Sequence, residues 1–235
     1  NLHLTDWWGT MKTSIIICAY NEEKTVSSVI RSCCEFRPED EIIVVDDGST
    51  DDTAELLIKL SKELNFINLR LNKKRGKSWA MVRGVEESSR DIILFFDADV
   101  TGIRPEHFND LVNPIIEGTA DMTLGQPSKT FIDYRLNPLK SLTGERAMFK
   151  MDILPILDDI RDIRFGVETY INLSFQSRGK RIRSVILEGL SHPTKFKKTI
   201  PIKATKEFLN EGQEIAATIL NNPDLVVERI LRLIS

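Results

Sequence analysis

The sequence predicts an α/β protein in which helices cover both faces of a mostly parallel β-sheet, and three observations support this class. Four apolar runs within the first hundred residues have the length of buried strands. Segments with the apolar spacing of helices separate these runs. A polar cluster follows each run, as expected where parallel strands end at a ligand-binding edge.

The four strands are expected at residues 13–20, 41–45, 66–72 and 91–96. The continuous apolar run "TSIIICAY" is typical of a strand covered on both faces. The segment "NEEKTVSSVIRSCCEF" predicts a helix capped by Asn21, and Ser49 or Thr50 is expected to cap the next helix. A third helix is predicted in "GKSWAMVRGVEESS" from the spacing of its apolar residues.

The second half of the chain is less regular. Strands are expected at residues 120–126 and 181–189, the latter ending near His192. Helices are predicted in "LTGERAMFKMDIL" and "GVETYINLSFQSRG", and one or two more over residues 202–235.

Length and composition exclude several classes. The 235 residues, 41% of them hydrophobic, suit one domain or one domain with a small appendage. A net charge of −3 gives no basic field for nucleic acid. The three cysteines have no disulfide-framework spacing, which indicates reduced thiols, and no apolar run approaches the ~20 residues that span a bilayer. Residues 1–10 fit no element and are expected to be a disordered leader or tag.

Asp97 and Asp99 form the most informative polar cluster. They follow the strand "DIILFF" one residue apart, and carboxylates this close repel each other unless positive charge lies between them. A strand ending in a solvated turn is one interpretation. The other is a hard divalent cation, held by both carboxylates and bridging to a diphosphate. No cysteine–histidine cluster has the spacing of a zinc site.

The remaining polar residues also admit two interpretations. Asp46 and Asp47 could read a nucleotide base or cap the next helix. The basic residues around Gly76 could meet phosphate or form a solvated surface. Glu168 could act in the site or favour a helix dipole, while Arg146 and His192 could be solvated surface residues.

Together the segments "SIIICAYNEEKTV", "IIVVDDGSTDDT", "NKKRGKSWAMVRGVEESSRDIILFFDADV" and "LTGERAMFK" resemble family 2 glycosyltransferases of the GT-A fold. The chain is most similar to the dolichyl- or polyprenyl-phosphate mannose and glucose synthases, and also to glucosyl-3-phosphoglycerate synthases. The likeness covers about residues 13–198 and is tight over 13–100. It implies a Rossmann-like, mostly parallel sheet with helices on both faces, plus C-terminal helices.

The resemblance also implies roles for particular residues. Nucleotide-sugar contacts are implied for Ala19, Tyr20, Asn21, Glu22, Asp46, Asp47, Lys77, Asp97 and Ala98. Asp97 and Asp99 match the DXD metal site, which His192 can join, and the implied cofactor is Mn²⁺ or Mg²⁺. Arg146, with Gly144 and with Thr143 in place of the usual serine, matches a segment near the acceptor phosphate. Glu168 matches the acidic residue that opens the acceptor-side helix, so the implied catalytic residues are Asp97, Asp99, Glu168 and Arg146.

This organisation predicts a catalytic domain over residues 11–200, with a nucleotide-binding half at 11–100, an acceptor half at 101–200 and a helical tail at 201–235. The implied function is metal-dependent, inverting transfer of a hexose from GDP-mannose or UDP-glucose to a polyprenyl or dolichyl phosphate. One alternative is transfer to a small soluble acceptor such as phosphoglycerate. Another is a non-catalytic protein that binds nucleotide sugars.

The tail admits a membrane surface as a further partner. In "NPDLVVERILRLIS", Leu225, Val226, Ile230, Leu233 and Ile234 lie near one face of a predicted helix. This stripe could pack on the protein's own core or on a second subunit. It could instead hold the protein peripherally to a membrane, helped by Lys195, Lys197 and Lys198. The expected location is the cytoplasm, at the cytoplasmic face of a membrane.

Overall fold

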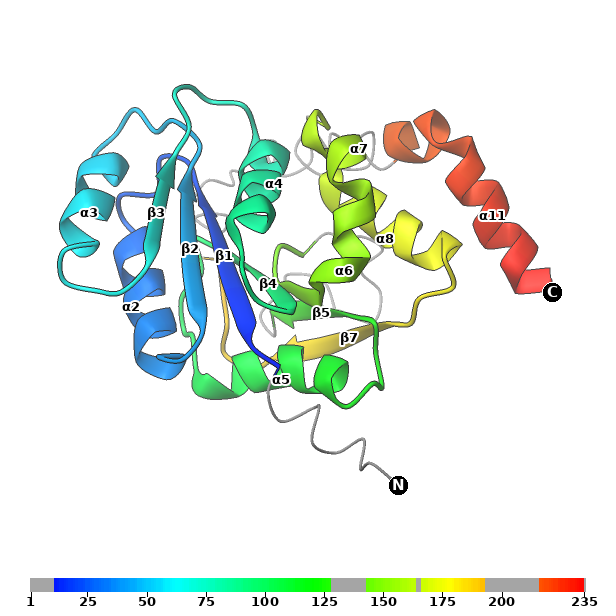
Figure 1. Cartoon of the computed structure of the whole chain (residues 1–235), viewed down its shortest axis with the longest axis horizontal. Helices are drawn as coiled ribbons and strands as arrows, with labels where there is room; N and C mark the ends of the chain where they lie inside the picture. Colours follow the sequence, from blue (N-terminus) through cyan, green and yellow to red (C-terminus); the bar gives the residue numbers. More distant parts are fainter. Residues whose placement is uncertain (1–10, 128–142, 164–165, 193–215, 235) are drawn as a thin grey trace, which may run out of the picture.

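A seven-stranded sheet forms the centre of the molecule (Figure 1), seen in a computed structural model that describes residues 11–127, 143–163, 166–192 and 216–234. The strand order is β3-β2-β1-β4-β6-β5-β7. The strands are β1 (Thr13–Ala19), β2 (Glu41–Asp46), β3 (Ile67–Arg70), β4 (Ile92–Asp97), β5 (Met122–Pro127), β6 (Arg146–Phe149) and β7 (Ile182–Leu187).

Most neighbouring strands run parallel, as predicted. β1 pairs in parallel with β2 and β4, and β2 pairs in parallel with β3. β6 is the exception, because it runs antiparallel to both β4 and β5. Strands from both halves of the chain therefore share one sheet.

Helices cover both faces of this sheet (Figure 1). Ile15 and Ile17 of β1 point into one hydrophobic cluster and the intervening Ile16 into another, as the alternation of a strand requires. The helices of the first cluster are α2 (Val26–Phe36), α3 (Thr53–Leu60) and α5 (Pro105–Ile116). Those of the second are α4 (Lys77–Glu87), α6 (Lys150–Ile153), α7 (Leu157–Arg161) and α8 (Val167–Ser177), with a 3₁₀ turn at Leu154–Ile156.

The helix predicted over "LTGERAMFKMDIL" is wrong at its start. Residues 146–149 form β6, and helix begins only at Lys150. Arg146, Ala147 and Met148 are buried between β4 and β5, and the backbone bonds available from those two strands outweigh the local preference for helix.

Two helix caps also differ from the prediction. α2 begins after Thr25 and α3 after Asp52. Asn21 instead takes a left-handed conformation with φ of 56°, and its backbone N–H donates to Ser49 Oγ. Asn21 and Ser49 therefore join the loop after β1 to the loop after β2 instead of capping the start of a helix.

The described part of the tail is helical, as predicted, over residues 216–221 and in α11 (Pro223–Ile234). Leu225 packs against the second hydrophobic cluster, so α11 lies partly on the protein's own core. Among the described residues, every helix is too short or too polar to cross a membrane. The predictions for residues 1–10 and for Lys195, Lys197 and Lys198 lie outside the described residues.

Candidate active site

The loops after β1 and β2 are bonded together at the carboxyl edge of the sheet. Asp47 N–H donates to the Ala19 carbonyl at 2.8 Å, and Glu22 N–H donates to Thr53 Oγ1 at 2.9 Å. Asp46 Oδ1 accepts from Ser49 N–H at 2.8 Å. Because these bonds join successive strand ends, the predicted nucleotide-contacting residues of both loops lie at one edge.

Asp47 extends this edge to the basic loop before α4. Its two carboxylate oxygens accept from the backbone N–H groups of Arg75 and Gly76, at 2.7 and 2.8 Å. Gly48 has a φ of +70°, and a Cβ there would lie 2.6 Å from the Lys73 carbonyl carbon, so only glycine allows the close approach. Lys74 Nζ lies 3.8 Å from the centre of the Tyr20 ring, so a cation and an aromatic face meet here.

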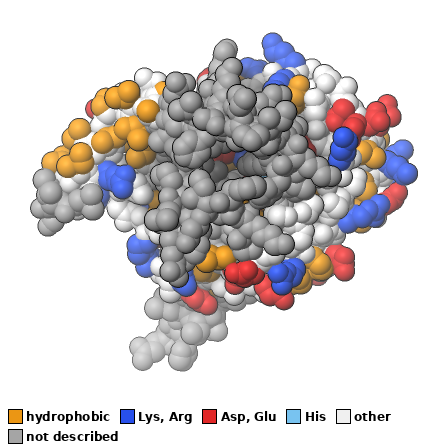
Figure 2. All heavy atoms as spheres, turned by 180° about the vertical axis from the view of Figure 1, so that it is seen from behind, with side chains coloured by type: hydrophobic (Ala, Val, Ile, Leu, Met, Phe, Trp, Pro, Cys, Tyr) orange, Lys and Arg blue, Asp and Glu red, His pale blue; other side chains and the backbone are white. Residues whose placement is uncertain are grey.

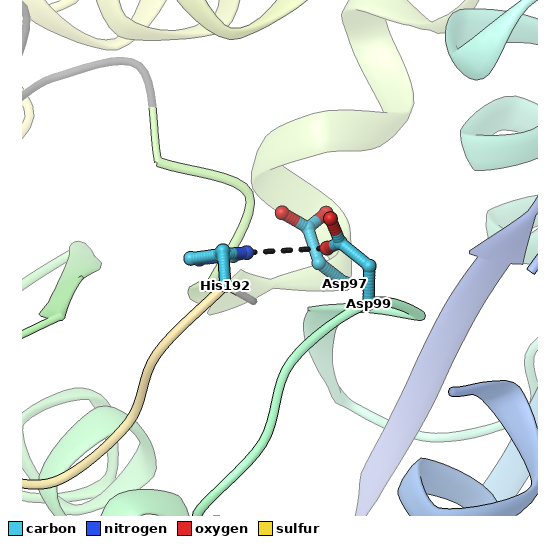
Figure 3. A group of neighbouring side chains, drawn as sticks. All are labelled: Asp97, Asp99 and His192. Atoms are coloured by element: carbon cyan, nitrogen blue, oxygen red, sulfur yellow. Dashed lines mark hydrogen bonds and ion pairs between the residues drawn. The ribbon is translucent and has the colours of Figure 1, made fainter. Parts of the chain in front are cut away.

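Asp97, Asp99 and His192 come together although His192 is far away in the sequence (Figure 3). One ligand atom from each residue lies within 4.8 Å of the others, and His192 Nδ1 is 3.1 Å from Asp99 Oδ1. An antiparallel bridge between Thr101 and Ser191 holds the two segments side by side. Two carboxylates and an imidazole, converging and mostly shielded from water, are a donor set that could hold a divalent cation.

Lys77 links this cluster to α8. Its Nζ lies 3.0 Å from Asp97 Oδ1 and 2.8 Å from Glu168 Oε1. Burial opposes the charged form of Lys77, but attraction to Asp97 and Glu168 outweighs it and raises the pKa of Lys77 well above its usual value. Burial alone would raise the pKa of Glu168, but Lys77 and Arg146 lower it. The site therefore holds a fixed positive charge beside ionised carboxylates.

Arg146 is fully buried, so the interpretation as a solvated helix residue is wrong. Its guanidinium donates to the Thr143 carbonyl at 2.6 Å, to Asn172 Oδ1 at 3.2 Å and to the Glu168 carbonyl at 3.3 Å. Arg146 thereby fixes the start of α8, and with it Glu168, relative to β6.

Gly144 lies directly against the cluster. A Cβ at this position would be 2.1 Å from Asp97 Oδ1 and 2.2 Å from Oδ2. The Asp97 carboxylate can therefore keep its position only if residue 144 has no side chain.

Glu145 is a buried carboxylate that the sequence interpretation missed. It is wholly inaccessible to solvent, and its Oε1 is 3.6 Å from His192 Nε2. Burial raises the pKa of Glu145, repulsion by Asp97 adds to this, and His192 opposes it. Its place between Gly144 and Arg146, in a segment already singled out, was the available signal.

The structure thus brings most predicted site residues to one edge of the sheet. The residues in mutual contact are Lys77, Asp97, Asp99, Glu168 and His192. Arg146 contacts this cluster only through the backbone carbonyl of Glu168. Ala98 differs from the others because its side chain is buried in the hydrophobic core. Its predicted contact with a nucleotide would have to come from its backbone.

The chain is similar to known proteins in its sequence and in its fold. A family model described as "Glycosyl transferase family 2" matches residues 14–183, more than half of the chain. The chain is 35% identical over 113 residues to the undecaprenyl-phosphate 4-deoxy-4-formamido-L-arabinose transferase of Salmonella choleraesuis (strain SC-B67), covering 46% of this chain and 34% of the relative. It is 34% identical over 87 residues to the poly-beta-1,6-N-acetyl-D-glucosamine synthase of Staphylococcus aureus (strain COL), covering 37% of this chain and 21% of the relative.

The chain therefore spans about a third or less of the length of these curated relatives. Among solved structures, it resembles glucosyl-3-phosphoglycerate synthase from Mycobacterium tuberculosis in complex with Mn²⁺, uridine diphosphate and phosphoglyceric acid. The TM-score is 0.69 at 23% identity, over 91% of this chain and 78% of that chain. Another structure of that synthase, in complex with Mg²⁺ and uridine diphosphate, gives a TM-score of 0.68.

Proposed function

This chain belongs to glycosyl transferase family 2 and has a GT-A-like α/β fold, and from that premise we propose that it transfers a hexose from a nucleotide sugar to a polyprenyl phosphate. The observation that carries the proposal is the convergence of Asp97, Asp99 and His192 at the carboxyl edge of the sheet, beside the Lys77–Glu168 ion pair. GDP-mannose and UDP-glucose are the proposed donors.

The proposed site for the donor's diphosphate lies between this cluster and the basic loop. Asp97, Asp99 and His192 would hold Mn²⁺ or Mg²⁺, since their ligand atoms converge within 4.8 Å. A cation bound there would offset the negative charge that develops on the departing nucleoside diphosphate. Solved structures of the fold hold Mn²⁺ or Mg²⁺ together with uridine diphosphate, which supports this choice of cofactor.

The chain's own residues supply orientation and charge. Asp47 holds the loop that carries Lys74 and Lys77 against the end of β2, where a base and ribose would lie. Lys77 is protonated and within reach of a phosphate oxygen near Asp97. Such preorganised charges stabilise a transition state because they need no reorganisation when the bond breaks.

A phosphate acceptor suits this arrangement better than a hydroxyl acceptor. A phosphate oxygen is already anionic and needs no general base, whereas a hydroxyl needs a group that accepts its proton. Glu168 is engaged by Lys77 with a lowered pKa, which makes it a weak base. The undecaprenyl-phosphate acceptor named for the Salmonella relative supports a lipid phosphate here.

The proposal includes a peripheral contact with the membrane that carries such a lipid, at its cytoplasmic face. Exposed apolar side chains gather on the tail, at Ile219, Leu220, Val227, Ile230 and Leu231. Figure 2 shows hydrophobic side chains collected at the end of the molecule where α11 lies. An amphipathic helix can bury such a face in the headgroup region.

The decisive experiment offers the protein a panel of nucleotide sugars with Mn²⁺ or Mg²⁺, with and without a polyprenyl phosphate. We expect metal-dependent transfer to the lipid phosphate, and Asp99→Asn should slow it by at least ~10²-fold without lowering Tm. Transfer to phosphoglycerate but not to the lipid would refute the acceptor. Nucleotide binding without transfer or donor hydrolysis would point to a binding protein instead.

A further inference from the structure

Glu145 has a position that the proposed chemistry does not explain. Its side chain is fully buried, and only one of its oxygens is hydrogen-bonded among the described residues: Oε2 accepts from Thr143 Oγ1 at 2.6 Å. Oε1 is inaccessible to solvent and has no hydrogen-bond partner there. Burying a carboxylate oxygen without a donor costs free energy, so its position calls for a specific reason.

The nearest candidate donor is the ring of His192. Nε2 lies 3.6 Å from Glu145 Oε1, and on the other side of the ring Nδ1 lies 3.1 Å from Asp99 Oδ1. The imidazole thus stands between two carboxylates from different parts of the chain. A neutral imidazole carries one proton, and the group facing each nitrogen decides which one carries it.

The surrounding structure holds both partners in place. The Glu145 carbonyl accepts from Gly125 N–H at 2.8 Å, which fixes its backbone against β5. Ser191, beside His192, exchanges backbone hydrogen bonds with Thr101 at 2.8 and 3.0 Å. Glu145 and His192 can therefore move apart only if these backbone hydrogen bonds break.

We propose that Glu145 is a positioning residue, which accepts the Nε2 proton of His192 once a divalent cation takes the place of the Nδ1 proton that faces Asp99 in the free site. This rests on the metal site of the proposed function and deepens it. A carboxylate behind a metal-binding histidine fixes the ring and its tautomer and makes the ring nitrogen a better ligand. The unpartnered Oε1 and the direction of the imidazole then have one explanation.

The first test measures the His192 tautomer without metal and with Mg²⁺, which is diamagnetic and leaves the spectra readable. The chain has three histidines, so long-range ¹H–¹⁵N spectra of the wild type are simple, and the His192 signals are those lost in His192→Asn. Without metal we expect the neutral ring to carry its proton on Nδ1, beside Asp99, and with saturating Mg²⁺ we expect it on Nε2, beside Glu145. A neutral ring that keeps its proton on Nδ1 at saturating Mg²⁺ would overturn the proposal, and this measurement needs no Glu145 variant to fold.

The second test is calorimetry of Mn²⁺ binding to the full chain. Glu145→Gln should weaken Mn²⁺ affinity by about 10- to 100-fold, the usual effect of removing such a carboxylate. Asp152→Asn is the matched control, because Asp152 is also a buried carboxylate but pairs with Lys180 away from the cluster. It should leave Mn²⁺ affinity unchanged.

The outcomes separate this inference from the function on which it rests. Equal Mn²⁺ affinity of wild type and Glu145→Gln would overturn the role of Glu145 but leave the metal site standing. A wild type that binds no Mn²⁺ would overturn the metal site, and the inference with it. A loss of affinity in Glu145→Gln, with Asp152→Asn unchanged and the wild-type proton on Nε2 at saturating Mg²⁺, would support both.

Discussion

Two carboxylates one residue apart at the end of β4 are stable in this protein because cationic and ring N–H groups are placed around them. Lys77 Nζ lies 3.0 Å from Asp97, and the His192 ring lies against Asp99. Each carboxylate thus has its own partner, which reduces the repulsion between them. A divalent cation must compete with Lys77 and His192 for the two carboxylates. These two residues therefore influence both the stability of the metal-free site and its affinity for the cation.

Gly144→Ala should disable the metal site while leaving the fold intact. The new methyl group would lie about where the Asp97 oxygens are, so the carboxylate must turn away from Asp99 and His192. We expect calorimetry to show at least ~10-fold weaker Mn²⁺ binding, because one ligand is displaced.

Gly84→Ala is the matched control for this substitution. Its methyl group would meet the Ile16 side chain in the core, so it should lower Tm but leave Mn²⁺ affinity alone. If Gly144→Ala instead lowered only Tm, Asp97 would not be a ligand.

Asp47→Ala should weaken nucleotide binding. The substitution leaves the N–H groups of Arg75 and Gly76 without their acceptor and frees the loop that carries Lys77. The expected loss is about 1–3 kcal/mol in affinity for UDP or GDP, measured by calorimetry.

Asp121→Ala serves as the control, because Asp121 also accepts a backbone N–H, from Arg181, but directly precedes β5 and so lies at the opposite end of the strands. Unaltered nucleotide affinity in Asp47→Ala, with only a lower Tm, would favour a purely structural role for Asp47.

At the scale of elements, the first half of the fold could be predicted and part of the second could not. β1, β2 and β4 are continuous apolar runs because both their faces are buried, and such runs stand out in a sequence. β6 is four residues long and includes a buried arginine, so its sequence resembles the start of a helix. Only the neighbouring strands β4 and β5 make it a strand, and no local pattern shows them.

The site residues likewise differ in how clearly the sequence marks them. Asp97 and Asp99 are adjacent to a strong strand signal, and Lys77 and Glu168 each open a helix. For Glu145 the sequence offers only its place between Gly144 and Arg146, because its role depends on the distance to His192, which the sequence does not contain.

Glu41→Gln should make the sheet less stable in a pH-dependent way. The Glu41 carboxylate ties the first residues of β2 to Ser14 of β1 at 2.5 Å and to Ser89, after α4, at 2.6 and 2.8 Å. Burial alone would raise the pKa of Glu41, but these hydrogen bonds outweigh it and the pKa falls below its usual value of 4.5.

A carboxyl group whose pKa is lowered by folding stabilises the fold above its unfolded pKa, and this contribution disappears as pH falls through the folded value. At pH 7 we expect Glu41→Gln to lower Tm by about 2–4 °C, as a loss of about 1 kcal/mol would do at this size. The difference from wild type should shrink below pH 4.5. Glu39→Gln, at an exposed position, is the control; equal pH profiles for all three proteins would contradict the role of Glu41.

At the scale of the whole molecule, the tail joins the catalytic fold through one face and leaves another exposed. Leu225 packs on the second hydrophobic cluster, beside α8, whereas Val227, Ile230 and Leu231 are each more than half exposed. α8 also carries Glu168 at its start, so the surface of α11 and the active site are attached to the same helix. A membrane contact through α11 would therefore hold the site in a fixed orientation to the bilayer.

The exposed face of α11 should bind anionic membranes. Val227, Ile230 and Leu231 are 52%, 52% and 56% exposed, so their replacement by glutamate leaves the packing of Leu225 on the core in place. We expect the wild type to float with anionic liposomes and the triple substitution to remain in the soluble fraction, since buried apolar area and charge both govern such binding. Ile58→Glu is the matched control, because Ile58 is 51% exposed on α3, far along the chain from α11. Equal flotation of the wild type and both variants, or of none of them, would show that this face is not the membrane contact.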